Sequence, residues 1–318
     1  MAEVPSERLL IAIGGNAIHP EVGPGTAEEQ AVFAARTSES LLPVLQRPNE
    51  LVITHGNGPV VGKILLRQVL SAEQVPPMPM DICVAHSQGG IAYLLMQAFE
   101  NALRRTNNQR HVVCLLTQVE VDPDDPAFKN PTKPIGFFYT EQDARDIEAR
   151  LGWTMREDSG RGWRYVVPSP VPQHIAGISM VRTVCASGAV AIAGGGGGIP
   201  VVRQRDGTRT GVHAVVDKDL TSAKMATVLG LDTLMLLTGV PEVSINFGKS
   251  NEQALREVSF TDMCGYQDEG QFPPGSMGPK VDAAMRFMKA GGKRAIIAHL
   301  DDAVTALNGS VGTHILQD

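Results

Sequence analysis

Short apolar runs alternate along the chain with amphipathic stretches that have helical spacing. The runs "RLLIAI", "ELVITH" and "GAVAIA" end just before Gly14, Gly56 and Gly194, and four more cover residues 111–117, 232–238, 294–299 and 312–316. Strands that are apolar almost throughout, with helices between them, are typical of a mostly parallel sheet that helices cover on both faces. The pattern therefore predicts an α/β fold.

Two helix boundaries are marked by local signals. Thr26 and Glu29 have the spacing of a capping box, which predicts that a helix begins there. A second predicted helix ends at Gly291 and has four apolar residues on one face: Val281, Ala284, Met285 and Met288.

Glycine-rich turns follow three of the predicted strands, at Gly14–Gly15, at Gly56–Gly58 and at the five glycines 194–198. A parallel sheet binds ligands at the carboxyl ends of its strands, and free backbone amides at such turns bind anions. Residues 194–198 could also form a flexible linker, but the apolar runs "AVAIA" and "IPVV" on either side favour a turn between strands. We expect glycine there because a ligand approaches the backbone closely.

Residues 122–170 interrupt the alternation with a segment rich in proline, charge and aromatic residues. The segment is long for a loop, so we predict a small inserted subdomain, called the lid below.

Composition excludes several classes of partner. The 318 residues carry a net charge of -6, which gives no general attraction to nucleic acid or anionic membranes. No run approaches the roughly 20 apolar residues of a membrane span, and the N-terminus has no signal segment, so we expect a cytoplasmic protein. The cysteines and histidines are too scattered for a zinc site or a disulfide framework, so no protein-bound metal is expected.

Glycine motifs leave more than one class of ligand open. Residues 56–62 have the spacing G-x-G-x-x-x-G, with Asp81 downstream, which approaches a dinucleotide fingerprint without matching it. A nicotinamide enzyme is therefore an alternative, whereas a P-loop sequence is missing.

Two lysines in the second half have the setting of phosphate ligands. Lys218 lies between Asp217 and Asp219, and we expect Asp219 to cap the following helix. Lys280 stands at a helix start behind Gly278. A lysine fixed in this way suits a phosphoryl-transfer site better than a solvated surface.

The motifs, taken in order, resemble those of the carbamate kinases within the amino-acid kinase family. The matching strings include "IGGNA", "HGNGPVVG", "DPAFKNPTKPIG", "GGGGGIPVV", "GVHAVVDKDL", "INFGK" and "PGSMGPK", and the likeness runs from about residue 9 to the C-terminus. It implies an open αβα sandwich around a mainly parallel sheet, with a small protruding subdomain. A single domain over residues 7–318 is expected, with an acceptor half at about 7–205, a nucleotide half at about 206–318 and the lid at 122–170.

The resemblance also implies an activity and its partners. It implies a homodimer that transfers a phosphoryl group reversibly between ATP and carbamate, giving ADP and carbamoyl phosphate, and that runs toward ATP in arginine breakdown. Mg²⁺ is expected with the nucleotide, held mainly by phosphates and water.

Site residues follow from matching the motifs position by position. The expected catalytic residues are Lys133 from the lid, Lys218, Asp219 and Lys280. The expected phosphate or acceptor ligands are Gly14, Gly15, Asn16, Gly56, Asn57, Gly58, Gly196 and Gly197. The expected nucleotide-binding residues are Thr238, Gly239, Phe247, Ser276 and Met277.

Three positions depart from the family's usual pattern: Val60, His86 and Pro241. The first two lie near the expected acceptor pocket. Two alternatives therefore stay open, a kinase of the same family with another carboxylate or phosphonate acceptor, and a nucleotide-binding regulator without activity. Retention of all three lysines argues against the regulator.

Overall fold

The computed structural model describes residues 7–20, 23–158, 160–272 and 277–318, and its centre is one large sheet. The sheet contains β1 (Arg8–Ile13), β2 (Glu50–His55), β3 (Val112–Leu115), β9 (Val190–Ala193), β12 (Thr233–Thr238), β15 (Glu257–Ser259), β16 (Arg294–His299) and β17 (Thr313–Leu316). Its order is β15-β17-β16-β12-β1-β2-β9-β3. Neighbouring strands run parallel, apart from the antiparallel pair β16 and β17.

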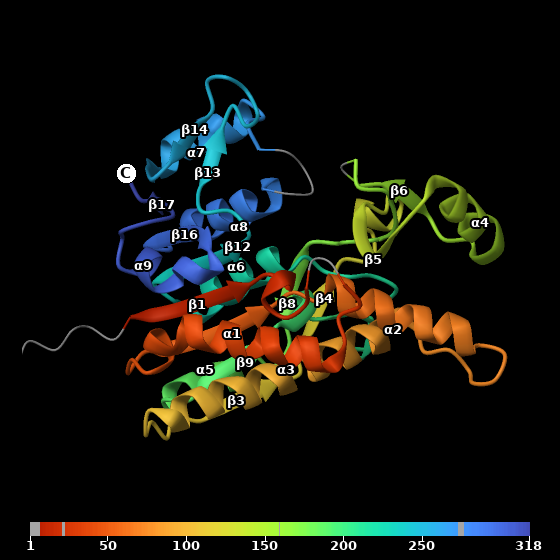
Figure 1. Cartoon of the computed structure of the whole chain (residues 1–318), viewed down its shortest axis with the longest axis horizontal. Coiled ribbons are helices and arrows are strands. Elements are labelled where there is room, and N and C mark those ends of the chain that lie inside the picture. The colour runs from red at the N-terminus through yellow and green to blue at the C-terminus, as the bar shows by residue number, and fades with distance from the viewer. Residues whose placement is uncertain (1–6, 21–22, 159, 273–276) are drawn as a thin grey trace, which may run out of the picture.

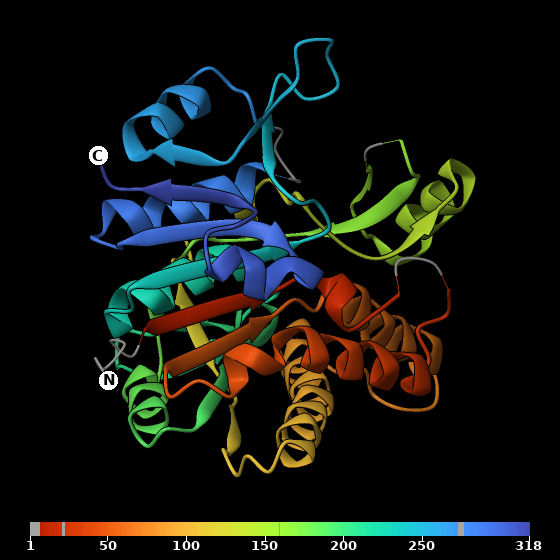
Figure 2. The same cartoon turned by 60° about the vertical axis from the view of Figure 1, so that its left-hand side comes forward.

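Alternate side chains of each central strand enter two different cores. In β1, Leu10 and Ala12 belong to one apolar cluster, whereas Leu9, Ile11 and Ile13 belong to the other. Helices α1 (Ala27–Leu45), α3 (Met80–Arg105) and α9 (Ala303–Leu307) pack on the second cluster. Helices α5 (Ile178–Ala186), α6 (Lys218–Leu229) and α8 (Gly278–Lys289) pack on the first (Figure 2). The predicted α/β sandwich is confirmed.

The helix boundaries agree with the sequence signals, with one exception. Thr26 and Glu29 form the predicted capping box of α1. The apolar face predicted for α8 is buried, and Gly291 follows the helix with a positive φ of 97°. The prediction that Asp219 caps α6 is wrong, because Asp217 is the capping residue and its Oδ1 accepts from the amide of Asp219 at 2.8 Å.

Smaller elements surround the main sheet. A second sheet, in the order β11-β10-β4-β8, is formed by β4 (Gln118–Val121), β8 (Pro172–Ile175), β10 (Ile199–Arg203) and β11 (Arg209–Gly211). The remaining elements of the body are α2 (Gly58–Ser71), α7 (Phe260–Asp268) and a hairpin of β13 (Val243–Ile245) and β14 (Gln253–Leu255). No helix in the described ranges is both long and apolar enough to cross a bilayer.

The segment predicted as a lid lies between β4 and β8, and it projects from one side of the body in both views (Figures 1 and 2). It contains α4 (Glu141–Leu151) and a sheet in the order β5-β7-β6, formed by β5 (Lys133–Tyr139), β6 (Met155–Glu157) and β7 (Trp163–Val167). Because β4 and β8 pair with each other, the chain leaves and re-enters the body at neighbouring points.

Two glycines form a close contact between the lid and the body. A Cβ built on Gly62 in α2 would overlap the backbone of Gly136 in β5, and Gly136 itself has a φ of +74°. Both "HGNGPVVG" and "NPTKPIG" end in these glycines. The two motifs therefore meet where the lid strand crosses α2.

Gly62→Ala is expected to destabilise the protein although alanine favours helices. The added methyl group must displace backbone, and overpacking of this kind costs about 1–3 kcal/mol. Gly90→Ala in α3 is the matched control, because no described atom lies within 4 Å of a Cβ built there. It should stabilise by about 0.5–1 kcal/mol. Urea denaturation of both variants measures the difference, and an equal gain in both would contradict the close contact.

Candidate active site

Three lysines from three separate elements gather around two carboxylates at the start of α6. Lys218 Nζ lies 2.6 Å from Asp219 Oδ1, and Lys280 Nζ of α8 lies 2.8 Å from Asp219 Oδ2. Lys133 Nζ of the lid strand β5 lies 2.5 Å from Asp217 Oδ2. The structure thus brings together all four predicted catalytic residues and adds Asp217, which sequence analysis assigned no role in the site.

These charges are held away from water. Burial acts to raise the pKa of Asp219, but Lys218 and Lys280 outweigh it and hold that pKa well below its usual range. Burial lowers the pKa of Lys218, whereas for Lys280 the Asp219 carboxylate outweighs burial and raises the pKa. The pKa of Asp217 is also lowered, since Lys133 outweighs the effect of burial. The two carboxylates therefore stay ionised.

Two of the predicted glycine turns lie side by side at the ends of β1 and β2. After Gly14 the chain forms a 3₁₀ turn, η1 (Gly15–Ala17), and a Cβ built on Gly56 would lie 3.1 Å from the amide nitrogen of Gly15. The amide of Gly56 donates to Ile13 O at 3.1 Å and so joins the two strand ends, and a ligand contact by Gly56 stays a prediction. A Cβ built on Gly58 meets no described atom within 4 Å.

Asn57 is buried between the second turn and α3. Its Nδ2 donates to Ser87 Oγ at 2.9 Å, which fixes the direction of the amide. The side chain of the other predicted amide ligand, Asn16, lies outside the described part of the chain.

Close packing against protein atoms accounts for glycine at three positions of the segment 194–198. A Cβ built on Gly195 would overlap the His55 ring, one on Gly196 would overlap the Asn57 amide, and one on Gly197 would overlap Val216 O. The amide of Gly197 donates a hydrogen bond to Gly194 O at 3.1 Å. Ligand contact by Gly196 or Gly197 stays a prediction without support from this geometry.

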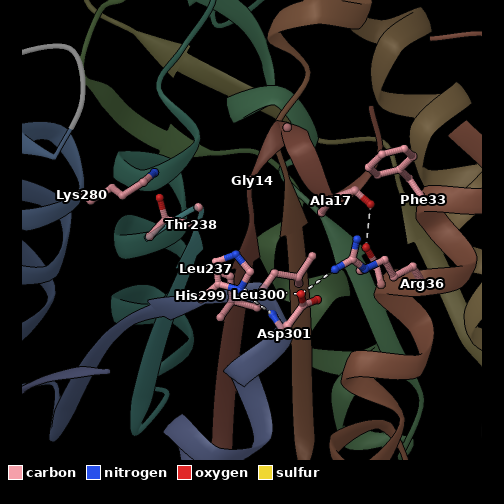
Figure 3. A pocket seen from close by; sticks show the side chains of 13 residues that line it. Gly14, Ala17, Phe33, Arg36, Leu237, Thr238, Lys280, His299, Leu300 and Asp301 are labelled. Atoms are coloured by element: carbon pink, nitrogen blue, oxygen red, sulfur yellow. Dashed lines mark hydrogen bonds and ion pairs between the residues drawn. The ribbon is translucent and has the colours of Figure 1, made fainter. Parts of the chain in front are cut away.

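A cavity of about 480 Å³ opens beside the lysine cluster (Figure 3). Lys280 and Thr238 lie on one side of it and Phe33 and Arg36 of α1 on the other. Five predicted site residues line it: Gly14, Gly15, Thr238, Gly239 and Lys280. Arg36 closes its far end with an ion pair, 2.6 Å from Asp301 Oδ2.

Of the other predicted nucleotide residues, Phe247 and Met277 do not line this cavity, and Ser276 is outside the described residues. Phe247 follows β13 and is 68% exposed. Met277 is the residue before α8. The roles of all five nucleotide residues stay predictions.

Comparison with known proteins identifies the family of the chain. Residues 7–299 match the model of the amino acid kinase family. The chain belongs to the amino acid kinase family. It is similar to a carbamate kinase of Pyrococcus horikoshii, with 46% identity over 97% of this chain and 99% of the relative. It also resembles the structure of a carbamate kinase from Giardia lamblia bound to AMP-PNP, at 41% identity and a TM-score of 0.90, covering 99% of each chain.

None of the three positions that depart from the family pattern is fully buried. His86 is exposed, whereas its neighbours Ser87 and Gln88 are buried and face the site. Gln88 holds the glycine segment, because its Nε2 donates to Gly195 O at 2.8 Å and its Oε1 accepts from the Thr117 amide. Val60 packs partly buried against the core, and Pro241 is exposed.

His55 is a buried residue of the site that sequence analysis did not single out. Its Nδ1 donates to Gly56 O at 3.0 Å, and burial lowers its pKa to about 4. The signal was its place in "HGNGP", directly before a predicted phosphate turn. As a neutral ring it fills the space above Gly195 without adding charge to the lysine cluster.

The buried His55 should make stability depend on pH in acid. Unfolding returns its pKa to about 6.5. Between pH 6.5 and 4 the ring is therefore protonated in the unfolded chain and neutral in the folded protein. The contribution of a neutral His55 to the free energy of unfolding is fully present above pH 6.5. It falls by up to about 3 kcal/mol as the pH decreases to 4. Urea denaturation of wild type and His55→Gln over this range should show a smaller loss in the variant. His86→Gln should keep the wild-type dependence, and equal losses in all three proteins would refute the assignment.

Proposed function

We propose that the protein is a carbamate kinase, which transfers a phosphoryl group reversibly between ATP and carbamate and forms ADP and carbamoyl phosphate. The observation that carries this proposal is that Lys133 of the lid pairs with Asp217, two residues from Asp219, which pairs with Lys218 and Lys280. Relatives at 43–46% identity over nearly the whole chain are named carbamate kinase, which supports the same acceptor.

The chemistry needs charge neutralisation and alignment rather than a base. Carbamate is already an anionic oxygen nucleophile, so the phosphoryl group can pass between two anions in line. Lys218 and Lys280 supply positive charge for the transferred group, and Asp219 fixes the two ammonium groups relative to each other. Amides at Gly14, Gly15 and Gly58 would bind the phosphoryl oxygens.

Mg²⁺ is proposed to enter with the nucleotide, where it offsets phosphate charge. The donor set of the site fits an ion held by phosphate oxygens and water, since Asp217 and Asp219 are both taken up by lysines. The described residues also contain no cluster of three His, Cys, Asp or Glu that would hold a metal alone.

We also propose an assembly and a cellular setting. A homodimer is supported by β3 at the edge of the main sheet and by exposed apolar residues beside it. Leu116 is 63% exposed and lies 3.9 Å from a Cβ built on Gly89, one turn before Tyr93, which is 59% exposed. We further propose a cytoplasmic enzyme that runs toward ATP in arginine breakdown.

The activity is tested by mixing ADP, Mg²⁺ and carbamoyl phosphate and detecting ATP. Wild type should form ATP, and Lys280→Ala should be slower by at least about a hundredfold, because it removes a charge aimed at the transition state. Lys289→Ala changes an exposed lysine at the other end of α8 and should keep wild-type turnover. Absence of ATP with the wild type would reject this reaction.

Lys133→Ala should separate turnover from nucleotide binding. If the lid lysine acts on the acceptor, ATP formation from carbamoyl phosphate should fall at least about a hundredfold while ADP affinity changes little. Calorimetry gives the affinity, and Lys129→Ala removes an exposed lysine of the same lid as the control. Equal loss of both quantities would place Lys133 in the nucleotide site, and no loss would make it a surface residue.

A further inference from the structure

His19 lies at the end of the first phosphate turn and is almost completely buried. Its amide donates to Gly15 O at 3.0 Å, so the backbone of His19 closes the η1 turn. Only 6% of the residue is exposed, and a Cβ built on Gly25 would overlap its ring. The ring is therefore held in place by the chain that follows the turn.

The hydrogen bonds of the ring define its protonation. Nδ1 lies 2.7 Å from Pro20 O, and since a carbonyl only accepts, Nδ1 carries the hydrogen. Nε2 lies 2.6 Å from Lys63 Nζ. An ammonium group only donates, so Nε2 must present its lone pair. The geometry requires a neutral His19.

Lys63 connects three parts of the molecule. It stands in the second turn of α2, whose first residue is Gly58, and its Nζ also donates to Pro24 O and Gly25 O. These acceptors and His19 use all three N–H bonds of an ammonium group. The same Nζ lies 5.7 Å from the centre of the Phe137 ring in the lid strand β5.

We propose that neutral His19 and Lys63 form a pH-sensitive clasp that holds the two phosphate turns and the lid in their working positions, and that protonation of His19 opens it. A protonated ring would place a second cation at 2.6 Å from the ammonium group, with no lone pair to receive it. This inference rests on the proposed binding of phosphate by the turns. Both residues are positioning residues, since neither is placed against the reacting atoms.

The surrounding charges favour the neutral ring. Burial lowers the pKa of His19, and the positive charge of Lys63 adds to this, although the Pro20 carbonyl and Glu29 of α1 act in the opposite direction. Burial also lowers the pKa of Lys63, with a contribution from Arg67 on the next turn of α2. The clasp is therefore complete above pH 6.5 and is lost progressively in more acid solution.

Kinetics test the clasp through a variant that keeps the hydrogen bonds but does not titrate. His19→Gln offers an acceptor to Lys63 and a donor to Pro20, so its kcat/KM for carbamoyl phosphate should match wild type at pH 8. Below pH 6.5 the wild type should fall progressively further behind His19→Gln as the pH decreases. The ratio of the two proteins cancels the ionisation of the substrates. His86→Gln should follow wild type at each pH.

Removal of either partner tests the positioning role at pH 8. His19→Ala and Lys63→Met should each lower kcat/KM about tenfold, and the double variant should lose no more than Lys63→Met, because that variant already lacks the bond to His19. A constant ratio of wild type to His19→Gln, or wild-type activity in either single variant, would overturn the proposal.

NMR of the histidine rings tests the clasp independently of enzyme activity, because it measures the tautomer and the titration midpoint of His19. At pH 8 His19 should be the Nδ1-protonated tautomer, and its titration midpoint should rise in Lys63→Met because a neighbouring cation has been removed. An unchanged midpoint would reject the clasp. If the NMR result holds but wild type makes no ATP, the proposed reaction fails and the clasp does not.

Discussion

Charge balance at the start of α6 is the constraint on which the site depends. A buried ammonium group without a partner costs several kcal/mol, so three lysines converge here only because Asp217 and Asp219 meet them. Two carboxylates against three lysines leave one net positive charge. The N-terminus of α6 adds a further positive potential at the same point. Anions are therefore favoured here by fixed protein charges.

The position of α6 in turn depends on the glycine segment. Gly194 packs against Met225 and Thr221 of α6, and Thr221 Oγ1 donates to Gly197 O at 2.8 Å. Val216, just before the helix, occupies the space that a side chain at Gly197 would need. Side chains in this segment would push α6 away from the sheet and separate Asp219 from the turns after β1 and β2.

Sequence patterns predicted the parts of the structure that local rules determine. Apolar runs predicted the strands of the main sheet except β15, and the spacing of Thr26 and Glu29 predicted the capping box of α1. The lysines were found because the motifs are distinctive, not because of any local periodicity.

Patterns failed where tertiary contacts decide. Asp217 and Asp219 both have the residue type of a helix cap, and only the ion pairs with Lys218 and Lys280 show that Asp219 is used otherwise. His19 and Lys63 are 44 positions apart and belong to no shared motif, so their contact could not be predicted from spacing. The close packing of protein atoms beside the glycines at 194–198 could not be predicted, because a sequence does not show what fills the space beside a glycine.

Two of the contacts that join the lid to the body lie on the same short strand. Lys133, the first residue of β5, pairs with Asp217 of the α6 cap, and Gly136, three residues later, rests on Gly62 of α2. These two contacts belong to the two sides of the site, the lysine cluster and the turn after β2. Because β5 crosses from one to the other, the reach of Lys133 is set by backbone contacts as well as by its flexible side chain. A lysine positioned in this way loses less conformational entropy when it meets an anion, since part of its freedom was already removed on folding.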